Sequence, residues 1–546
     1  MTESYAAGET EPPLLEATIG ADFEATVARA PQGEALVEVA SGRRWTWRQL
    51  DDAVNEVARG LLALGLAAGD RVGIWAPNCA EWTIAQFATA KAGIVLVNVN
   101  PAYRTHELAY VIDQSGMRML LSATSFKTSD YRAMLAELTS TGSADGTGGP
   151  GALEKVIFLD GPDWVDLIEG GRGLPDTALA DRMAELSPSD PINIQYTSGT
   201  TGFPKGATLS HRNILNNGYF TTETIKLTAE DRLCIPVPFY HCFGMVMANL
   251  GCTTHGATMV IPAPAFDPTS TLRAVQDERC TVLYGVPTMF IAEQALADFA
   301  DYDLSSLRSG IMAGSICPIE VMRRCVEDMH MSEVSIAYGM TETSPVSCQT
   351  RVDDDLERRT STIGRAAPHV EIKIIDPVTG RTVPRGEAGE FCTRGYSVML
   401  GYWDAPDRTA EAIDDDGWMH TGDLAVMRED GYCNVVGRIK DMVIRGGENI
   451  YPREIEEFLY THPDIEDVQV VGVPDAKYGE ELCAWIRLRA GAAPIDADAV
   501  RAFAAGKLAG YKIPRYVLVV DEFPMTITGK IRKVEMRERS TELLGL

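Results

Sequence analysis

The stretch from residue 46 to residue 99 alternates helical and strand patterns, and this alternation limits what the chain can fold into. Thr46–Gln49 has the form of a helix-capping box, and apolar residues then recur three and four positions apart. A short apolar run at 72–76, a second helical pattern at 81–91 and a β-rich run at 93–99 follow. The sequence therefore predicts an α/β fold of layered sheets and helices.

The length of the chain indicates that this fold has more than one domain. At 546 residues, the chain exceeds what one hydrophobic core usually organises. Beyond about residue 440 the pattern changes to short units typical of a compact α+β domain. We expect a large multi-lobed N-terminal body at 1–439 and a small mobile C-terminal domain at 440–546. The expected elements of the small domain are a helix near 454–460, strands at 468–473 and 483–488, and a helix near 497–508.

Composition excludes several functional classes. The net charge of -28 argues against a broad surface for nucleic acid or anionic lipid, since both require clustered cations. The 11 cysteines show no paired metal-ligand spacing and are typical of reduced, mostly buried thiols, which favours the cytoplasm. The acidic N-terminus resembles neither a signal nor a transit peptide, and we expect no transmembrane segment. The sequence leaves open whether the chain forms a homodimer.

The stretch Tyr196–Gly206 combines several features that a phosphate site needs. Its glycines let the backbone approach an oxyanion, Thr and Ser hydroxyls surround them, and Lys205 supplies a compact cation. The spacing is not that of a Walker A sequence, which disfavours a P-loop NTPase. Because glycine-rich hydroxyl loops also form ordinary turns, this stretch alone leaves phosphate binding and a plain turn both open.

Four later segments, taken together with this stretch, indicate a family. They are Tyr338–Thr343, Thr421–Asp423, Gly437–Pro452 and Pro524–Lys530. In order and spacing, the five segments resemble the adenylate-forming superfamily, which contains acyl-CoA synthetases, firefly luciferases and peptide-synthetase adenylation domains. The resemblance covers nearly the whole chain. Longer segments such as RGYSVMLGYW and DMVIRGGENIYP look most like the medium-chain fatty acyl-CoA synthetase branch.

The resemblance implies a reaction. The chain would be an ATP-dependent fatty acyl-CoA synthetase for medium to long chains, with Mg2+ as cofactor and ATP and CoA as co-substrates. A carboxylate is a poor electrophile, so the first half-reaction would form an acyl-adenylate and pyrophosphate. The thiol of CoA would then displace AMP and give the thioester.

The resemblance also implies a set of site residues. The catalytic residues would be Lys530, Thr341 and Glu342, with Thr341 bonding the α-phosphate and Glu342 holding Mg2+. Asp423 would accept bonds from both ribose hydroxyls and Arg438 would bond the ribose from the other side. The full set expected to bind ATP and AMP is Thr197, Ser198, Gly199, Thr200, Thr201, Gly202, Lys205, Tyr338, Gly339, Asp423 and Arg438.

Movement of the small domain is part of the implied mechanism. Lys530 would bridge carboxylate and α-phosphate oxygens, and its acetylation would remove the charge and switch the enzyme off. Lys440 would be the hinge, although residues 437–441 taken alone suit an ordinary polar loop equally well. Gly446 and Gly447 would line a tunnel for the narrow thiol arm of CoA.

The acyl pocket is the least determined part of the sequence. By family position, Phe239, His241, Tyr284, Gly285 and Gly314 would line it, and the apolar and small residues among them suit a hydrocarbon acid. Peptide-synthetase domains place an aspartate in the first of these segments, and none stands there, so an amino acid substrate would leave its ammonium unpaired. His241 is either a pocket wall or a satisfied core histidine.

Three rival functions remain open. An acyl-AMP ligase would pass the acyl group to a carrier protein, and an aryl-CoA ligase would use an aromatic acid on the same core. An inactive acyl or nucleotide sensor belongs to a different class. The sensor is disfavoured because the residues with chemical roles are all present, namely Lys205, Thr341, Glu342, Asp423, Arg438 and Lys530.

Overall fold

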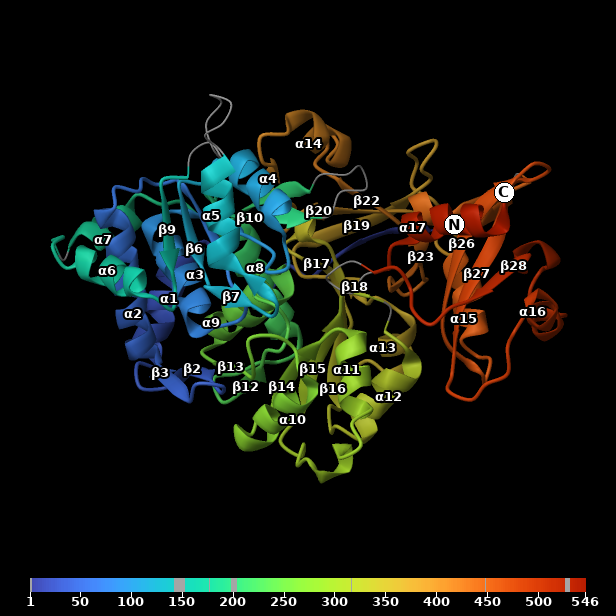
Figure 1. Ribbon diagram of the computed structural model, residues 1–546, viewed down its shortest axis with the longest axis horizontal. Coiled ribbons are helices and arrows are strands. Elements are labelled where there is room, and N and C mark those ends of the chain that lie inside the picture. The colour runs from blue at the N-terminus through green and yellow to red at the C-terminus, as the bar shows by residue number, and fades with distance from the viewer. Residues whose placement is uncertain are drawn as a thin grey trace. The chain divides into compact units, whose positions relative to one another are not determined.

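The computed structural model describes residues 2–141, 153–175, 177–197, 204–315, 317–446, 448–525 and 531–546. The chain separates into two compact units (Figure 1). The larger unit comprises Ala6–Ile372 and Thr393–Met419, and the smaller unit comprises Met1–Tyr5, Lys373–Cys392 and His420–Leu546. The domain boundary predicted between residues 439 and 440 falls inside the last of these segments and remains a prediction.

One sheet of the larger unit contains seven strands. In spatial order they are β21 (Gly401–Tyr402), β11 (Lys205–Ser210), β10 (Pro191–Thr197), β5 (Val95–Asn98), β4 (Arg71–Trp75), β6 (Met119–Ser122) and β9 (Lys155–Phe158). The strands from β10 to β9 run parallel, whereas β11 pairs antiparallel with both β10 and β21. All four residues of β5 are buried, as expected for a parallel strand covered on both faces.

A second sheet of the larger unit contains nine strands. In spatial order they are β18 (Arg365–Ala366), β17 (Val346–Gln349), β16 (Glu333–Gly339), β15 (Ser309–Ala313), β14 (Val282–Gly285), β12 (Arg232–Cys234), β13 (Thr258–Ile261), β2 (Glu34–Glu38) and β3 (Arg43–Thr46). The strands from β16 to β2 run parallel, and antiparallel strands close both edges.

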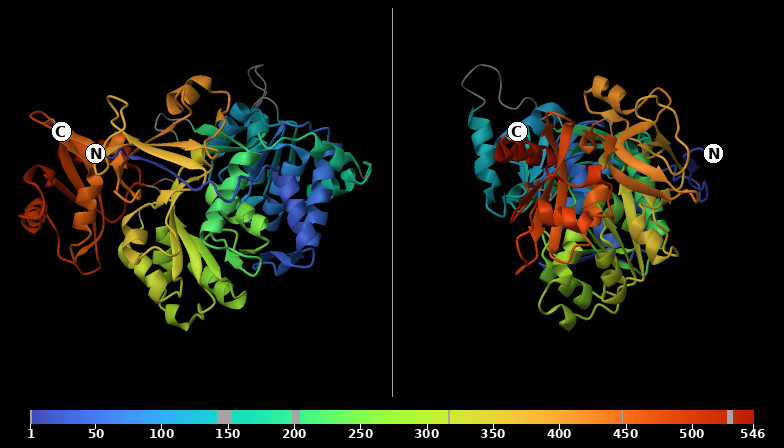
Figure 2. Two further views of the ribbon diagram at one scale, coloured as in Figure 1. Left: turned by 180° about the vertical axis from the view of Figure 1, so that it is seen from behind. Right: turned by 90° about the vertical axis from the view of Figure 1, so that its right-hand side faces the viewer.

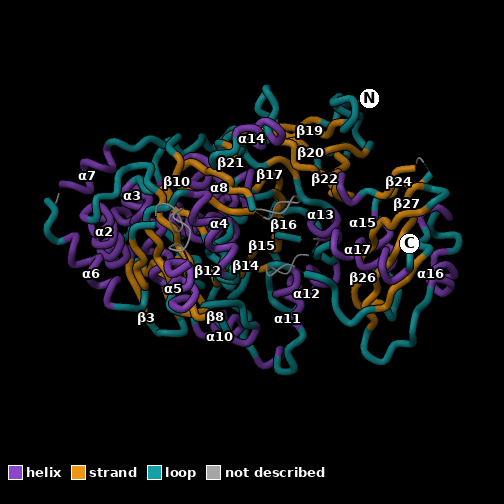
Figure 3. The backbone as a smooth tube through the Cα atoms, turned by 45° about the horizontal axis from the view of Figure 1, so that its top comes forward, coloured by secondary structure: helices purple, strands orange, loops and turns teal. Residues whose placement is uncertain are grey.

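Helices alternate with these strands along the chain and cover the sheets (Figure 3). The helices of the larger unit are α1 (Ile19–Arg29), α2 (Trp47–Ala63), α3 (Ala80–Ala92), α4 (Thr105–Ser115), α5 (Tyr131–Thr141), α6 (Pro162–Gly171), α7 (Thr177–Ala184), α8 (His211–Thr224), α9 (Gly251–His255), α10 (Pro268–Asp277), α11 (Pro287–Gln294), α12 (Ile319–Glu327), α13 (Leu356–Ser361) and α14 (Pro406–Ala412). A π-helix at Phe243–Leu250 precedes α9. The predicted capping box is confirmed, since Thr46 and Gln49 exchange both bonds at the start of α2. The predicted α/β class is also confirmed.

The C-terminal part of the smaller unit is an α+β layer (Figure 2, orange and red). Its sheet follows the order β25 (Glu448–Ile450), β24 (Val443–Arg445), β27 (Gly479–Leu488) and β26 (Ile465–Asp475), with β28 (Tyr516–Val519) on β27. Its helices are α15 (Pro452–Leu459), α16 (Ala497–Ala504) and α17 (Lys533–Leu544). The sequence placed the end of α16 too late, because Gly506 adopts a φ of +74° and both Lys507 and Leu508 donate to the Ala504 carbonyl.

A further sheet supplies most of the remaining strands. It follows the order β1 (Tyr5–Ala7), β19 (Val370–Ile375), β20 (Ala388–Gly395), β22 (Met419–Met427) and β23 (Cys433–Arg438). Strands β22 and β23 pair antiparallel and carry two of the predicted site residues. Within the described part of the chain, no helix has both the length and the apolar character needed to cross a bilayer.

Candidate functional site

The two ends of the predicted phosphate loop meet in the hairpin of β10 and β11. Thr197 ends β10 and lies directly opposite Lys205, which begins β11. A Cβ on Gly206 would lie 2.9 Å from Ile194 Cγ2, so the close approach of the strands favours glycine there. Of the predicted loop residues, Ser198, Gly199, Thr200, Thr201 and Gly202 lie outside the described residues.

Glu342 lies beside the first residue of this loop. It belongs to a 3-10 turn at Thr341–Thr343 that follows β16, and it is only 5% exposed. One carboxylate oxygen, Oε1, accepts from Thr197 Oγ1 at 3.3 Å and from the Tyr402 hydroxyl at 2.8 Å. The structure therefore brings together two motifs that are 145 residues apart in the sequence.

Tyr402 is a site residue that sequence reasoning missed. Besides donating to Glu342, its ring lies under the Lys205 ammonium, with 4.7 Å between Nζ and the ring centroid. Burial, together with the charge of Glu342, raises the pKa of Tyr402, so the hydroxyl stays a proton donor. The only available signal was its position within the RGYSVMLGYW segment, which marked the family but gave the tyrosine no role.

The turn that carries Glu342 is tightly packed. A Cβ on Gly339 would lie 1.8 Å from the Pro345 carbonyl oxygen, so no larger residue fits without a backbone shift. Thr341 is buried, and its carbonyl accepts from the Ser344 amide at 3.1 Å. Tyr338 is half-buried and pairs with Cys348 across β16 and β17. This packing fixes the backbone that carries Glu342.

Asp423 and Arg438 lie opposite each other on β22 and β23 of the smaller unit. Arg438 Nε is 3.0 Å from Asp423 Oδ1. The Asp423 side chain is 13% exposed and the Arg438 side chain 66% exposed. The two residues expected to hold a ribose from opposite sides are thus bonded to each other here.

The predicted acyl-pocket residues differ in their burial. Phe239 and Tyr284 are fully buried, with their rings 5.6 Å from Trp82 and 5.5 Å from Phe243 respectively. The buried Tyr284 hydroxyl has no hydrogen-bond partner among the described residues. Gly285 is also buried, whereas His241 is half-buried and Gly314 is exposed. The pocket assignment remains a prediction for all of these residues.

The predicted hinge lies in a 3-10 turn at Ile439–Asp441, where Lys440 is exposed. Arg537 of α17 donates to the Lys440 carbonyl at 2.8 Å and lies 3.0 Å from Asp441 Oδ1. Gly446 adopts a φ of +61°, and its amide donates to the Tyr478 carbonyl. Gly447 and Lys530 lie outside the described residues.

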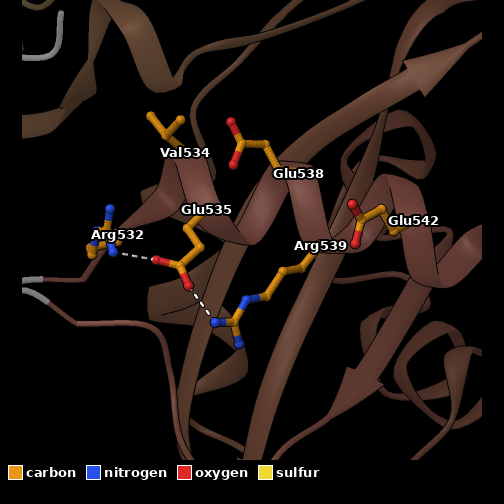
Figure 4. A pocket seen from close by; sticks show the side chains of 6 residues that line it. All are labelled: Arg532, Val534, Glu535, Glu538, Arg539 and Glu542. Atoms are coloured by element: carbon orange, nitrogen blue, oxygen red, sulfur yellow. Dashed lines mark hydrogen bonds and ion pairs between the residues drawn. The ribbon is translucent and has the colours of Figure 1, made fainter. Parts of the chain in front are cut away.

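Two surface hollows lie in the smaller unit. One, of about 450 Å³, lies along α17, where Glu535 pairs with both Arg532 and Arg539 (Figure 4). Its mostly charged walls do not suit a hydrocarbon chain. The other, of about 390 Å³, is lined by Arg445, Tyr478, Glu481, Arg501, Gly510, Ile513 and Arg515. Its three arginines are each paired with a carboxylate, so an anion entering there would have to compete with those partners.

Comparisons with known proteins match most of the chain to two family models. A family model described as AMP-binding enzyme matches residues 23–403, and a second, described as AMP-binding enzyme C-terminal domain, matches residues 454–530. The chain is 49% identical over 545 residues to the putative acyl-CoA synthetase YngI of Bacillus subtilis, covering 98% of this chain and 99% of that protein.

Two more comparisons extend this result. The chain is 46% identical over 558 residues to the mitochondrial medium-chain acyl-CoA ligase ACSF2 of Danio rerio, covering 100% of this chain and 92% of that protein. The crystal structure of ATP-bound MatB from Rhodopseudomonas palustris superposes with a TM-score of 0.82 at 30% identity, covering 97% of this chain and 100% of that chain. The chain therefore belongs to the AMP-binding, adenylate-forming enzyme family.

Proposed function

We propose that the chain is an AMP-forming fatty acid–CoA ligase. It activates a fatty acid as an acyl-adenylate with release of pyrophosphate, and then transfers the acyl group to the thiol of CoA with release of AMP. The observation that carries this proposal is the buried Glu342 carboxylate, held by Thr197 and Tyr402 where the glycine-rich loop begins. The relatives named acyl-CoA synthetase and medium-chain acyl-CoA ligase support the substrate class.

The donor set around Glu342 fits Mg2+. This ion prefers hard oxygen ligands and is commonly held by one or two carboxylates together with substrate phosphates. The bonds to Glu342 come from two neutral hydroxyls, so they orient the carboxylate without neutralising it. When bound, Mg2+ would neutralise phosphate charge during attack by the fatty acid carboxylate.

Cations and hydrogen-bond donors of the chain would supply the remaining chemistry at the phosphates. Lys205, placed over the Tyr402 ring, would attract the β and γ phosphates and retain the leaving pyrophosphate. Thr341 would donate to the α-phosphate. Lys530 would stabilise the charge that develops between the carboxylate and the α-phosphate, as its match to the family motif implies.

The ribose would be bound by Asp423, whose carboxylate can accept from two hydroxyls. Arg438 is largely exposed, so it can turn from Asp423 toward a nucleotide at little cost. Acyl specificity would come from the apolar wall around Phe239 and Tyr284, which suits a hydrocarbon chain, and the relative named medium-chain acyl-CoA ligase supports a medium length. Gly446 would flank the path of the CoA thiol arm.

Further elements of the proposal concern movement, control and location. The segment 440–546 would rotate about Lys440 between the two half-reactions, and Lys440→Pro should impair thioester formation if it is the pivot. Acetylation of Lys530 should stop adenylate formation while leaving thioester formation from preformed adenylate unchanged. We also propose a cytoplasmic location and a homodimer, which fractionation and sedimentation would test.

A single experiment tests the function. AMP release is measured over a panel of straight-chain, branched and aromatic acids, with and without CoA, for the wild type and Lys530→Ala. We expect AMP and acyl-CoA from medium-length straight-chain acids and a loss of both in the variant. Preference for benzoate would indicate an aryl-CoA ligase, and transfer only to a carrier protein would indicate an acyl-AMP ligase. A complete lack of AMP release would indicate an inactive sensor.

A further inference from the structure

Three side chains of different chemistry meet close to Asp423 in the smaller unit. Glu390 and Cys392 are two residues apart on β20, so they share one face, and both are buried. His420 lies on the neighbouring strand β22, with Nδ1 3.0 Å from Glu390 Oε2 and 3.7 Å from Cys392 Sγ. The function proposed above assigns these residues no role.

Strand β20 also holds the part of β22 that presents Asp423. Glu390 Oε1 accepts from the Gly422 amide at 3.1 Å, and the Phe391 carbonyl accepts from Thr421 Oγ1 at 2.7 Å. The Asp423 amide in turn donates to Thr421 Oγ1 at 3.1 Å. Gly422 adopts a φ of +70°, which departs from extended strand geometry. Glu390 therefore binds the backbone of the residue that directly precedes Asp423.

We propose that Glu390 is a positioning residue for ribose recognition, acting through residues Thr421–Asp423 of β22. One carboxylate oxygen accepts from the Gly422 amide, and the other is hydrogen-bonded to His420. Both bonds together restrict rotation of the Glu390 carboxylate. Because Glu390 is only 8% exposed, its bonds form away from competing water. This inference rests on the proposed function, since it assumes that Asp423 binds the ribose hydroxyls.

A metal ion is the alternative occupant of this cluster. The ligand atoms of Glu390, Cys392 and His420 all lie within 4.8 Å of one another. With bonds of about 2.0–2.2 Å, a nitrogen and an oxygen on one tetrahedral zinc ion would stand roughly 3.3 Å apart. The observed 3.0 Å between His420 and Glu390 matches a direct hydrogen bond better. The geometry thus favours a cluster joined by direct hydrogen bonds between protein groups, without a metal ion.

The test compares binding of ATP and 2′-deoxy-ATP by calorimetry. In the wild type, Asp423 should favour ATP, because 2′-deoxy-ATP lacks one of the two hydroxyls. Glu390→Ala should lose most of this discrimination, with ATP affinity falling about tenfold. Asp423→Ala should lose the discrimination too, whereas Glu387→Ala serves as the matched control, because Glu387 is an exposed carboxylate just before the same strand.

A conservative variant separates positioning from simple destabilisation. In Glu390→Gln, the amide oxygen can still accept from Gly422 while the amide nitrogen donates to His420, so discrimination should be restored. If Glu390→Ala does not fold, Glu390→Met keeps the side-chain volume and takes its place. Equal weakening of both nucleotides in the apolar variant, with discrimination intact, would overturn the proposal.

Two other results would also overturn it, and they differ from a failure of the proposed function. If Asp423→Ala keeps the discrimination, the ribose is bound elsewhere and Glu390 cannot position its ligand. If the purified wild type holds stoichiometric zinc that Cys392→Ser loses, the cluster is a metal site. Fatty acid-dependent release of AMP would continue in either case, whereas its absence in the wild type would reject the function itself.

Discussion

Two carboxylates in different units of the molecule differ in the charge of the groups that bond to them. Glu342 in the larger unit is buried and receives its bonds from two neutral hydroxyls, those of Thr197 and Tyr402. Asp423 in the smaller unit is bonded to the guanidinium of Arg438, which is mostly exposed. The first carboxylate keeps its charge available, whereas the second has a cation beside it.

The difference follows from what each carboxylate would bind. A divalent cation requires uncompensated negative charge, and neutral donors orient a carboxylate without removing that charge. Ribose hydroxyls are neutral, so a carboxylate that accepts from them works equally well beside an arginine. Charge should therefore matter more at Glu342 than at Asp423, where hydrogen-bond geometry should decide.

The largest effect is expected at Glu342. Glu342→Gln keeps the shape of the side chain but removes its charge, so kcat for adenylate formation should fall by about a hundredfold or more. The measurement is fatty acid-dependent AMP release against Mg2+ concentration, with Glu387→Gln as control. A variant with normal kcat at limiting Mg2+ would show that Glu342 holds no metal.

Tyr402→Phe should have the next largest effect. The change removes one hydrogen bond to a charged group, worth about 1.5–3 kcal/mol, yet keeps the ring under Lys205. We expect the Mg2+ concentration needed for half-maximal rate to rise about tenfold, from the lower end of that range. Tyr402→Leu also removes the ring and should lose more activity, so equal effects of the two changes would reject a separate role for the hydroxyl.

The pH profile offers a second check on Tyr402. The ordinary tyrosine pKa is near 10. The pKa of Tyr402 is raised, so its hydroxyl should remain protonated at pH values where an ordinary tyrosine ionises. The ratio of wild-type to Tyr402→Phe activity should therefore stay constant from pH 7 to about pH 10. A fall of this ratio toward 1 within that interval would show that the hydroxyl ionises.

Asp423→Asn should act mainly on affinity. The amide keeps one acceptor but loses the second, so KM for ATP should rise about tenfold while kcat changes little. Steady-state kinetics with varied ATP at saturating fatty acid and CoA would separate the two constants. A fall in kcat without a change in KM would mean that Asp423 acts in the chemical step, and the contrast with Glu342 would then fail.

Arg438→Ala should have the smallest effect. An exposed ion pair contributes about 0.2–1 kcal/mol, so KM for ATP should rise no more than about fivefold. Steady-state kinetics with varied ATP, as for Asp423→Asn, would measure this KM. A loss of kcat comparable to that of Glu342→Gln would show that Arg438 acts in the chemical step and not only in binding the ribose.

Sequence motifs predicted the α/β class, the small C-terminal α+β region and the approach of Glu342 to the phosphate loop. These features depend on local pattern or on long motifs with a shared function. Tyr402 and Glu390 were missed because no motif gave either residue a role, and only the folded chain brings them to Glu342 and Gly422. Tyr402 reaches across 60 positions to Glu342, and Glu390 reaches across 32 to Gly422. The chain therefore carried these residues without a local signal of their role.

The most direct measurement of the central claim is exchange of labelled pyrophosphate into ATP in the absence of CoA. This exchange reports formation and reversal of an acyl-adenylate. We expect exchange that depends on a medium-length straight-chain fatty acid and Mg2+, and its near-complete loss in Glu342→Gln. Absence of fatty acid-dependent exchange in the wild type, or release of ADP and phosphate in its place, would contradict an adenylate-forming fatty acid–CoA ligase.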